Sequence, residues 1–308
     1  MAVSTPRSLA GGMAASLRGY LAAAYPYQRF LYLVAAVFAV NAAVHAVVFV
    51  VDDRPWAGPA SWRQPLAFSV AFVFVLSSLA WALGFLQRRQ RLGWAVCGTL
   101  GVAALGTVSL IALQAWRATP AFFPPDRPFE QGVWTGMQIG IGLIVLPIVV
   151  EIVWAMTPLQ APPSFQWAIR AGLLFMLAGL AMGGLMVAEG VRQDIGSGQL
   201  DSPVTFGEAG LVVFPHLLSL HGLFVLGALA WLLSFTALPE RGRVRTVQVA
   251  IVGYLTMVTV SLTQALGGSA PFDLTGVLAV LFWVSVILLA AVLAATLTRL
   301  RPSAPQHD

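Results

Sequence analysis

Three histidines lie inside apolar segments, where an ionisable side chain is costly and therefore marks a candidate functional site. His45 lies in the segment 30–51, and His216 and His221 lie in the segment 213–237. A neutral imidazole is a common metal ligand, and two facing imidazoles can hold the iron of haem b. On a regular helix, residues with the spacing of His216 and His221 point about 140° apart, so these two side chains do not easily share one ion.

We therefore expect His45 and His221 to bind haem b or a single metal ion, with His216 as a peripheral partner. The alternative is that each histidine only hydrogen-bonds a neighbouring helix and binds no ligand. No histidine motif of recognised metal-binding spacing is present in the sequence, which leaves both interpretations open.

Arginine and amide side chains gather near the same ends of the apolar segments as the histidines. Arg63 and Arg117 are suited to bind haem propionates or another anion, because guanidinium–carboxylate pairs are strong and often bidentate. Trp62 and Trp116 are adjacent to these two arginines, so the alternative is that both Trp–Arg pairs anchor the chain at the membrane interface. The residues that we expect to contact a substrate are Gln114, Gln264, Asp53 and Arg192.

The composition identifies the environment of these side chains. Of the 308 residues, 58% are hydrophobic and 9% are charged, whereas an ordinary globular domain has about 25% charged residues. A soluble fold of this size could not bury so much apolar surface. All 17 basic residues are arginine, which excludes a lysine Schiff base. The single cysteine, Cys97, excludes an intrachain disulfide and any multi-cysteine metal centre.

Eight segments are long and apolar enough to cross a bilayer as helices, which takes about 20 residues each. They predict an all-α polytopic membrane protein with the spans 30–51, 65–86, 92–115, 132–155, 167–189, 213–237, 246–267 and 276–298. The preceding segment 1–29 is expected to be cytoplasmic. Within it Leu17, Tyr20, Leu21 and Ala24 share one helical face that suits a helix lying in the interface.

Arginine is distributed unevenly between the two sides of these spans. The termini and one set of connections carry a net charge of +9, and the other connections carry −4. By the positive-inside rule we expect a plasma (inner) membrane protein with both termini in the cytoplasm. The basic balance then reflects topology, and no arginine cluster interleaved with aromatic residues indicates binding to nucleic acid.

The two halves of the chain share residues at an offset of 150. This pattern predicts two parallel four-helix repeats, 30–155 and 156–298, followed by a cytoplasmic tail, 299–308. Coincidence in an apolar alphabet is the alternative. Repeat-built membrane proteins tend to place sites where the halves meet, here at the second, third, sixth and seventh spans. The matching residues are Pro65 and Pro215, Ser69 and Ser219, Gln114 and Gln264, and Ala115 and Ala265.

Glycines recur every four residues in two of the predicted spans. Small residues at this spacing let helix backbones approach closely. They predict tight packing and a homodimer formed through 132–155 and 167–189. The glycines are Gly132, Gly136 and Gly140 in the first of these spans, and Gly179 and Gly183 in the second.

The chain resembles an uncharacterised family of bacterial eight-span integral membrane proteins. The resemblance covers residues 30–298 and brings no known activity with it. Related proteins usually have Ser-His-Phe-Asn after the arginine that ends the third span. Here 121–124 reads Ala-Phe-Phe-Pro, so a loop histidine that might complete a metal site is missing. The resemblance rests on the Trp62-Arg63-Gln64-Pro65 helix start, the Gln114–Arg117 helix end, the Pro128-Phe129-Glu130 and Pro271-Phe272-Asp273 elements, and His216 with His221.

These polar residues predict an outward-facing His/Arg/Gln pocket above a closed, apolar inner half. The expected function is that of a haem- or metal-binding membrane redox protein. A small-solute transporter or permease is the second interpretation, and an interfacial membrane enzyme acting on a lipid-like substrate is the third. In the inner half, Glu151 is expected to pair with Arg170 or to reach the interface.

Overall fold

The computed structural model describes residues 8–56, 58, 60–122, 126–197 and 212–301, except for the side chains of 189 and 191–197. Within these residues the chain is all-α, and eight helical segments are long and apolar enough to cross a membrane. This confirms the predicted polytopic fold. The helices are α1 (Leu9–Ala23), α2 (Pro26–Val51), α3 (Arg63–Leu83), α4 (Gln90–Trp116), α5 (Pro128–Ala155), α6 (Pro163–Ser197), α7 (Val213–Leu220), α8 (Gly222–Ser234), α9 (Glu240–Leu266) and α10 (Gly276–Leu297).

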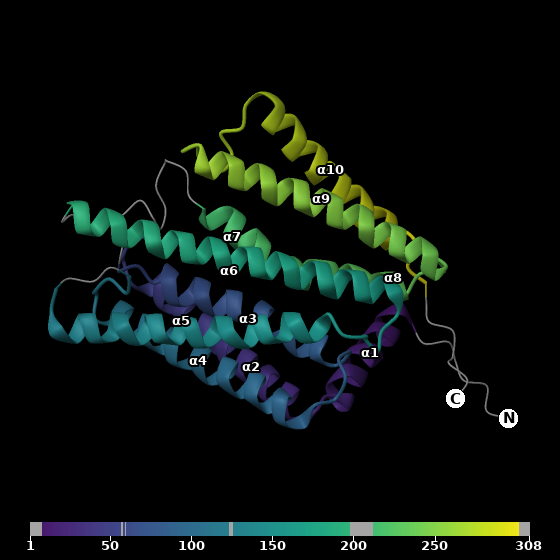
Figure 1. Ribbon diagram of the computed structural model, residues 1–308, viewed down its shortest axis with the longest axis horizontal. Coiled ribbons are helices and arrows are strands. Elements are labelled where there is room, and N and C mark those ends of the chain that lie inside the picture. Colours follow the sequence, from purple (N-terminus) through teal and green to yellow (C-terminus); the bar gives the residue numbers. More distant parts are fainter. Residues whose placement is uncertain (1–7, 57, 59, 123–125, 198–211, 302–308) are drawn as a thin grey trace.

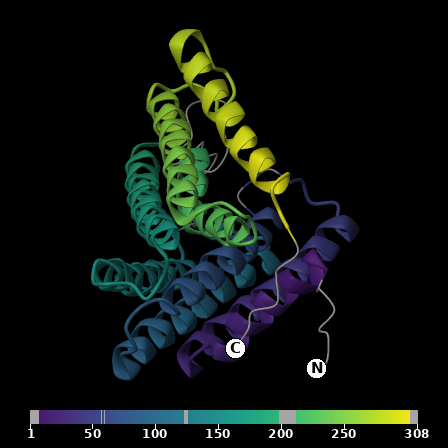
Figure 2. The same cartoon turned by 90° about the vertical axis from the view of Figure 1, so that its right-hand side faces the viewer.

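The helices lie in layers, with α6, α7 and α8 between two groups (Figure 1). On one side are α2–α5, and on the other are α9 and α10 (Figure 2). We call the two ends of the bundle the Trp62 end, where α2 ends and α3 begins, and the Arg88 end, where α3 ends and α4 begins. The orientation of these ends in the cell stays a prediction.

Large apolar side chains cover the outside of the bundle. Val50 is 82% exposed and Val280 is 60% exposed, whereas buried positions include amide, hydroxyl and carboxyl groups. This distribution suits a bilayer, because exposing apolar groups to hydrocarbon costs no free energy, whereas polar groups there must find partners inside the protein.

The predicted amphipathic segment forms α1, which packs against the Arg88 end. The Ser16 hydroxyl accepts a hydrogen bond from Trp231 Nε1 on α8 (3.1 Å), and the Tyr20 ring contacts Phe85 after α3 edge-on (6.0 Å). Leu17 and Leu21 are each about half exposed. The predicted apolar face is therefore shared between the protein and its surroundings.

The sixth span is one membrane-crossing segment, Val213–Ser234, and it contains one irregular residue. Here α7 ends at Leu220 and α8 begins at Gly222, with His221 at the junction (φ −89°, ψ 0°). The backbone N–H of His221 is shared between the carbonyls of Leu217 and Leu218, both at 3.2 Å. The Tyr254 hydroxyl of α9 also donates to Leu218 O (2.5 Å). Leu218 O therefore accepts from two donors, and one of them comes from another helix.

The glycine pattern packs within the chain. A Cβ on Gly179 would lie 2.9 Å from Leu220 N, and one on Gly183 would lie 3.0 Å from His216 Cε1, so α6 and α7 approach closely. Gly140 of α5 lies against Thr107 of α4. This confirms the predicted tight packing at Gly140, Gly179 and Gly183, whereas a Cβ on Gly132 would meet no described atom within 4 Å. The homodimer stays a prediction.

Two helix ends match at the offset of 150 residues. Both α4 and α9 have 27 residues and start 150 positions apart. Gln114 Nε2 donates to Pro120 O (3.5 Å), and Gln264 Nε2 donates to Ala270 O (2.5 Å). The turns after them contain left-handed residues, Ala118 (φ 52°) and Gly268 (φ 77°). The repeat of whole halves stays a prediction, supported by these local matches.

Candidate functional site

His45 lies on α2 near the Trp62 end and is 2% exposed. Its ring packs against the indoles of Trp62 and Trp116, with centroid distances of 5.8 and 6.3 Å, and the two indoles contact each other at 4.8 Å. His45 Nδ1 is 2.9 Å from Asn41 O. Because a carbonyl only accepts, Nδ1 carries the hydrogen and Nε2 of the neutral ring is an acceptor. Nε2 is buried without a partner among the described residues.

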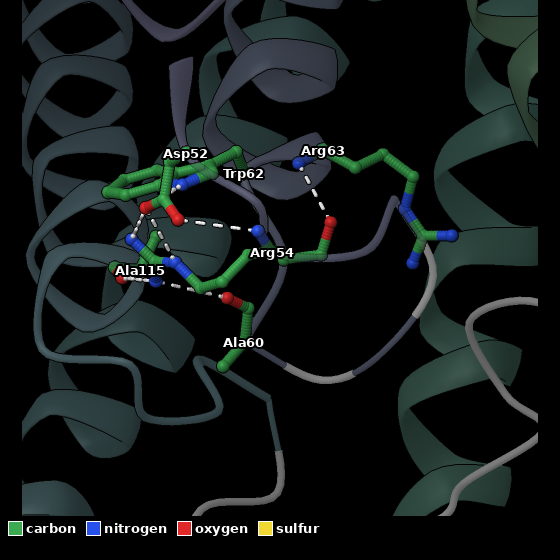
Figure 3. Close-up of polar contacts among 7 residues, drawn as sticks. Asp52, Arg54, Ala60, Trp62, Arg63 and Ala115 are labelled. Atoms are coloured by element: carbon green, nitrogen blue, oxygen red, sulfur yellow. Dashed lines mark hydrogen bonds and ion pairs between the residues drawn. The ribbon is translucent and has the colours of Figure 1, made fainter. Parts of the chain in front are cut away.

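Arg54 lies next to Trp62 and connects the residues after α2, the start of α3 and the end of α4 (Figure 3). Its Nε donates to Asp52 Oδ2 (3.0 Å), and its Nη1 donates to Ala115 O at the end of α4 (2.6 Å). Its guanidinium carbon lies 3.7 Å from the centre of the Trp62 ring. The Trp62 indole N–H donates to the same carboxylate oxygen of Asp52 (2.8 Å). The Asp52, Arg54 and Trp62 side chains therefore form one closed cluster.

This cluster makes stability depend on pH. The hydrogen bond from Trp62, and then those from Arg54, hold the pKa of Asp52 below its ordinary value of 3.8. A carboxyl group whose pKa is lower in the folded state stabilises the fold above its ordinary pKa, and this contribution is lost as the pH falls through the folded pKa. We expect Asp52→Asn to lower the melting temperature near neutral pH, and its difference from wild type to shrink below about pH 3.8.

The neighbouring acid provides the matched control for that measurement. Asp53 is exposed, so Asp53→Asn should follow the wild-type melting curve at every pH. A difference between wild type and Asp52→Asn that stays constant down to the most acidic buffer would contradict the role of the carboxylate.

Arg63, the first residue of α3, is 5% exposed. Its backbone N–H donates to Ser61 Oγ (3.0 Å), and its side chain points away from the Asp52–Arg54–Trp62 cluster (Figure 3). Arg63 is therefore not part of that cluster, and its predicted contact with a cofactor or anion stays a prediction.

Arg117 has a carboxylate partner within the protein. Its Nη2 lies 2.7 Å from Glu130 Oε1 on the first turn of α5, and its guanidinium carbon lies 4.4 Å from the centre of the Phe129 ring. The ion pair joins the end of α4 to the start of α5. The predicted anion contact is thus occupied by an acid of the same chain.

Gln114 and Gln264 are 0% and 4% exposed, and their amide nitrogens close the turns described above. They have a structural role in these turns, and their contact with a substrate stays a prediction. Gln114 Oε1 is buried without a partner in the described part of the chain. The side chain of Arg192 lies outside the described residues, as does most of the loop that follows it.

The two histidines of the sixth span have similar hydrogen bonds. His216 Nδ1 lies 2.7 Å from Gly179 O on α6, and His221 Nδ1 lies 2.7 Å from Leu217 O. As in His45, the carbonyl partner assigns the hydrogen to Nδ1 and leaves Nε2 as an acceptor. Ser219, between them in sequence, is fully buried, and its hydroxyl has no partner among the described residues.

His45 and His221 contact different levels of α3. The His45 ring contacts Trp62, whereas the His221 ring contacts Phe74 (5.8 Å). Residues 62 and 74 are separated by about 18 Å along a helix axis. These contacts place the two imidazoles at different heights along α3, so the structure does not support the predicted haem ligation by this pair. Among the described residues, no group of three or more His, Cys, Asp or Glu side chains could hold a metal ion.

Sequence reasoning missed three contributors to these arrangements. They are Arg54, Asn41 and Tyr254. Asn41 Nδ2 donates to Ser69 Oγ (2.7 Å). A polar residue in the middle of an apolar span was the available signal for both Asn41 and Tyr254.

Comparisons of this chain with family models, with curated proteins and with solved structures find no match. The resemblance to an uncharacterised family therefore stays a prediction, and the chain is described by what its residues show: an eight-span helical membrane protein.

Proposed function

We propose that the protein is a small-solute transporter whose binding site lies at the α7–α8 break. The observation that carries this proposal is the irregular residue His221 within the sixth span, next to the buried Ser219 hydroxyl, which has no partner among the described residues. Transporters commonly build solute sites near the bilayer midplane from discontinuous helices, where backbone and side-chain groups are released from helical hydrogen bonds.

The position of the break supports this assignment. The span covers Val213–Ser234, so His221 lies about 12 Å from its start at the helical rise, in the middle third of a bilayer core of about 30 Å. The break also faces the first half of the chain, because His221 and Phe224 of the sixth span contact Phe74 of α3. Sites between halves are typical of transporters.

The chemistry of the site favours a solute with N–H or O–H groups. The Nε2 atoms of His216 and His221 accept hydrogen bonds when the rings are neutral, and the Ser219 hydroxyl can both donate and accept.

Cysteine accessibility tests the proposal. In a Cys97→Ala background, Ser219→Cys is expected to react with a membrane-impermeant cationic methanethiosulfonate reagent from both faces of the membrane, in intact cells and in inverted vesicles. Ser285→Cys on α10 is the matched control, since Ser285 is also a buried serine in mid-span and its hydroxyl donates to Phe282 O. Reaction from one face alone would overturn transport, and reaction no faster than the control would overturn the site.

A cofactor-binding function is the second candidate. It is favoured by the hydrogen bonds of His45, His216 and His221, each of which leaves Nε2 as an acceptor, as in histidines that bind metals. Each would have to act with ligands other than the predicted His45–His221 pair. Haem absorbance in the purified protein would favour this function over transport, and a colourless, metal-free protein would remove it.

A further inference from the structure

Among the described residues, the Glu151 carboxyl group lies fully buried without an ion pair. Glu151 is on α5, one turn before the helix ends at Ala155, and is 0% exposed. Neither of its carboxyl oxygens has a hydrogen-bond partner among the described residues. Trp154, one turn further on the same helix face, has a buried indole N–H that also lacks a partner in that part of the chain. The interior is thus polar on one face of α5 and provides no counter-charge there.

The charged and titratable groups around Glu151 do not neutralise it. From α6, Arg170 donates to Ala155 O (3.1 Å) and Thr157 O (3.2 Å), and thereby caps the end of α5. From α4, Cys97 is the titratable group close enough to interact electrostatically with Glu151. The prediction that Glu151 pairs with Arg170 or reaches the interface is therefore wrong: the carbonyls at the helix end bind the guanidinium, and the carboxyl is buried.

The same helix contains a glutamate in the opposite situation. Glu130, at the Trp62 end of α5, is 3% exposed and forms the 2.7 Å ion pair with Arg117. A buried carboxylate with such a partner is stable in its charged form, whereas a buried carboxylate without one costs several kcal/mol. Two buried glutamates on one helix are thus expected to differ in protonation.

We propose that Glu151 is a proton-binding site, in which the carboxyl group is held neutral and exchanges one proton with water entering from the Arg88 end. In the forward step the O–H bond breaks, the proton passes to water, and the carboxylate keeps the electron pair. The Trp154 N–H, buried on the same helix face and without a partner among the described residues, is the donor assigned to that carboxylate in this proposal. A metal ion does not suit the site, because hard cations require several oxygen ligands and Cys97 and Trp154 contribute none.

Labelling with dicyclohexylcarbodiimide tests this inference on the intact protein in liposomes, because the reagent adds to protonated carboxyl groups in apolar surroundings. Peptide mapping by mass spectrometry is expected to find the adduct on Glu151 at least about tenfold more than on Glu130, because Glu130 is paired with Arg117 and Glu151 has no partner among the described residues. The yield on Glu151 should fall in alkaline buffer. Equal labelling, or labelling of Glu130 alone, would overturn the proposal.

If the reagent does not reach Glu151, infrared spectroscopy can still determine whether its carboxyl group is protonated. A protonated carboxyl band is expected in wild type at neutral pH, retained in Glu130→Gln and lost in Glu151→Gln. If Glu151→Gln does not fold, the wild-type spectrum still decides, since absence of the band contradicts a neutral carboxyl. The inference does not depend on the transport proposal, because neither measurement involves a solute or Ser219.

Discussion

Replacing Gly172 with alanine is expected to prevent folding or to lower the melting temperature of the purified protein by a large amount. A Cβ at this position of α6 would overlap Leu223 Cα and lie 2.9 Å from Leu223 N. Both obstacles belong to the α8 backbone, which cannot move aside as a flexible side chain can. Overpacking of this kind typically costs about 1–3 kcal/mol and occasionally more, and we expect the upper end of that range.

Gly184 on the same helix is the matched control. A Cβ there would meet no atom within 4 Å, so Gly184→Ala should leave the melting temperature unchanged or raise it, since alanine is favoured over glycine in a helix by about 1 kcal/mol. Differential scanning fluorimetry in detergent would measure both variants. Similar melting temperatures would contradict the close approach of α6 and α8, and with it the positioning of the α7–α8 break.

Arg54→Met is expected to lower the free energy of unfolding by about 2–3 kcal/mol. The change removes the donor to Ala115 O, a bond between a charged group and a carbonyl of a residue that is 2% exposed. A hydrogen bond to a charged group is worth about 1.5–3 kcal/mol. The stacking of the guanidinium on Trp62 is lost as well. Methionine retains the length and apolar stem of the side chain, so the loss is confined to the guanidinium.

Unfolding by SDS titration would measure this change. Arg127→Met is the control, because Arg127 is an exposed arginine before α5 at the same end of the bundle and its replacement removes an equal charge. A similar loss in both variants would show that net charge is responsible, and would contradict a specific bridge from the α2–α3 connection to α4.

The eight spans could be predicted because each is a long apolar run, and length with hydropathy is sufficient to identify a membrane helix. The break at His221 could not be predicted in this way. The residues from Gly222 to Leu233 continue the apolar run without a charge, and the hydroxyl that satisfies Leu218 O comes from Tyr254 on another helix.

Polar partners were harder to predict than polar positions. His45 and Glu151 were correctly expected within spans, but their surroundings depend on which helices touch. From the sequence, Arg170 could bind either of two acceptors: a carboxylate on α5 or the free carbonyls at the end of that helix. The structure shows that it binds the carbonyls. Composition gives no basis for ranking these two, because the choice depends on the relative height of α5 and α6.

The contacts of α1 have a mechanical consequence. This helix forms a hydrogen bond with Trp231 in the second half of the chain and contacts Phe85 in the first half. It therefore connects the two halves at the Arg88 end. Rotation of one half against the other would then pivot about this connection. The opposite end, where Trp62 and the start of α7 lie, would swing through the larger arc.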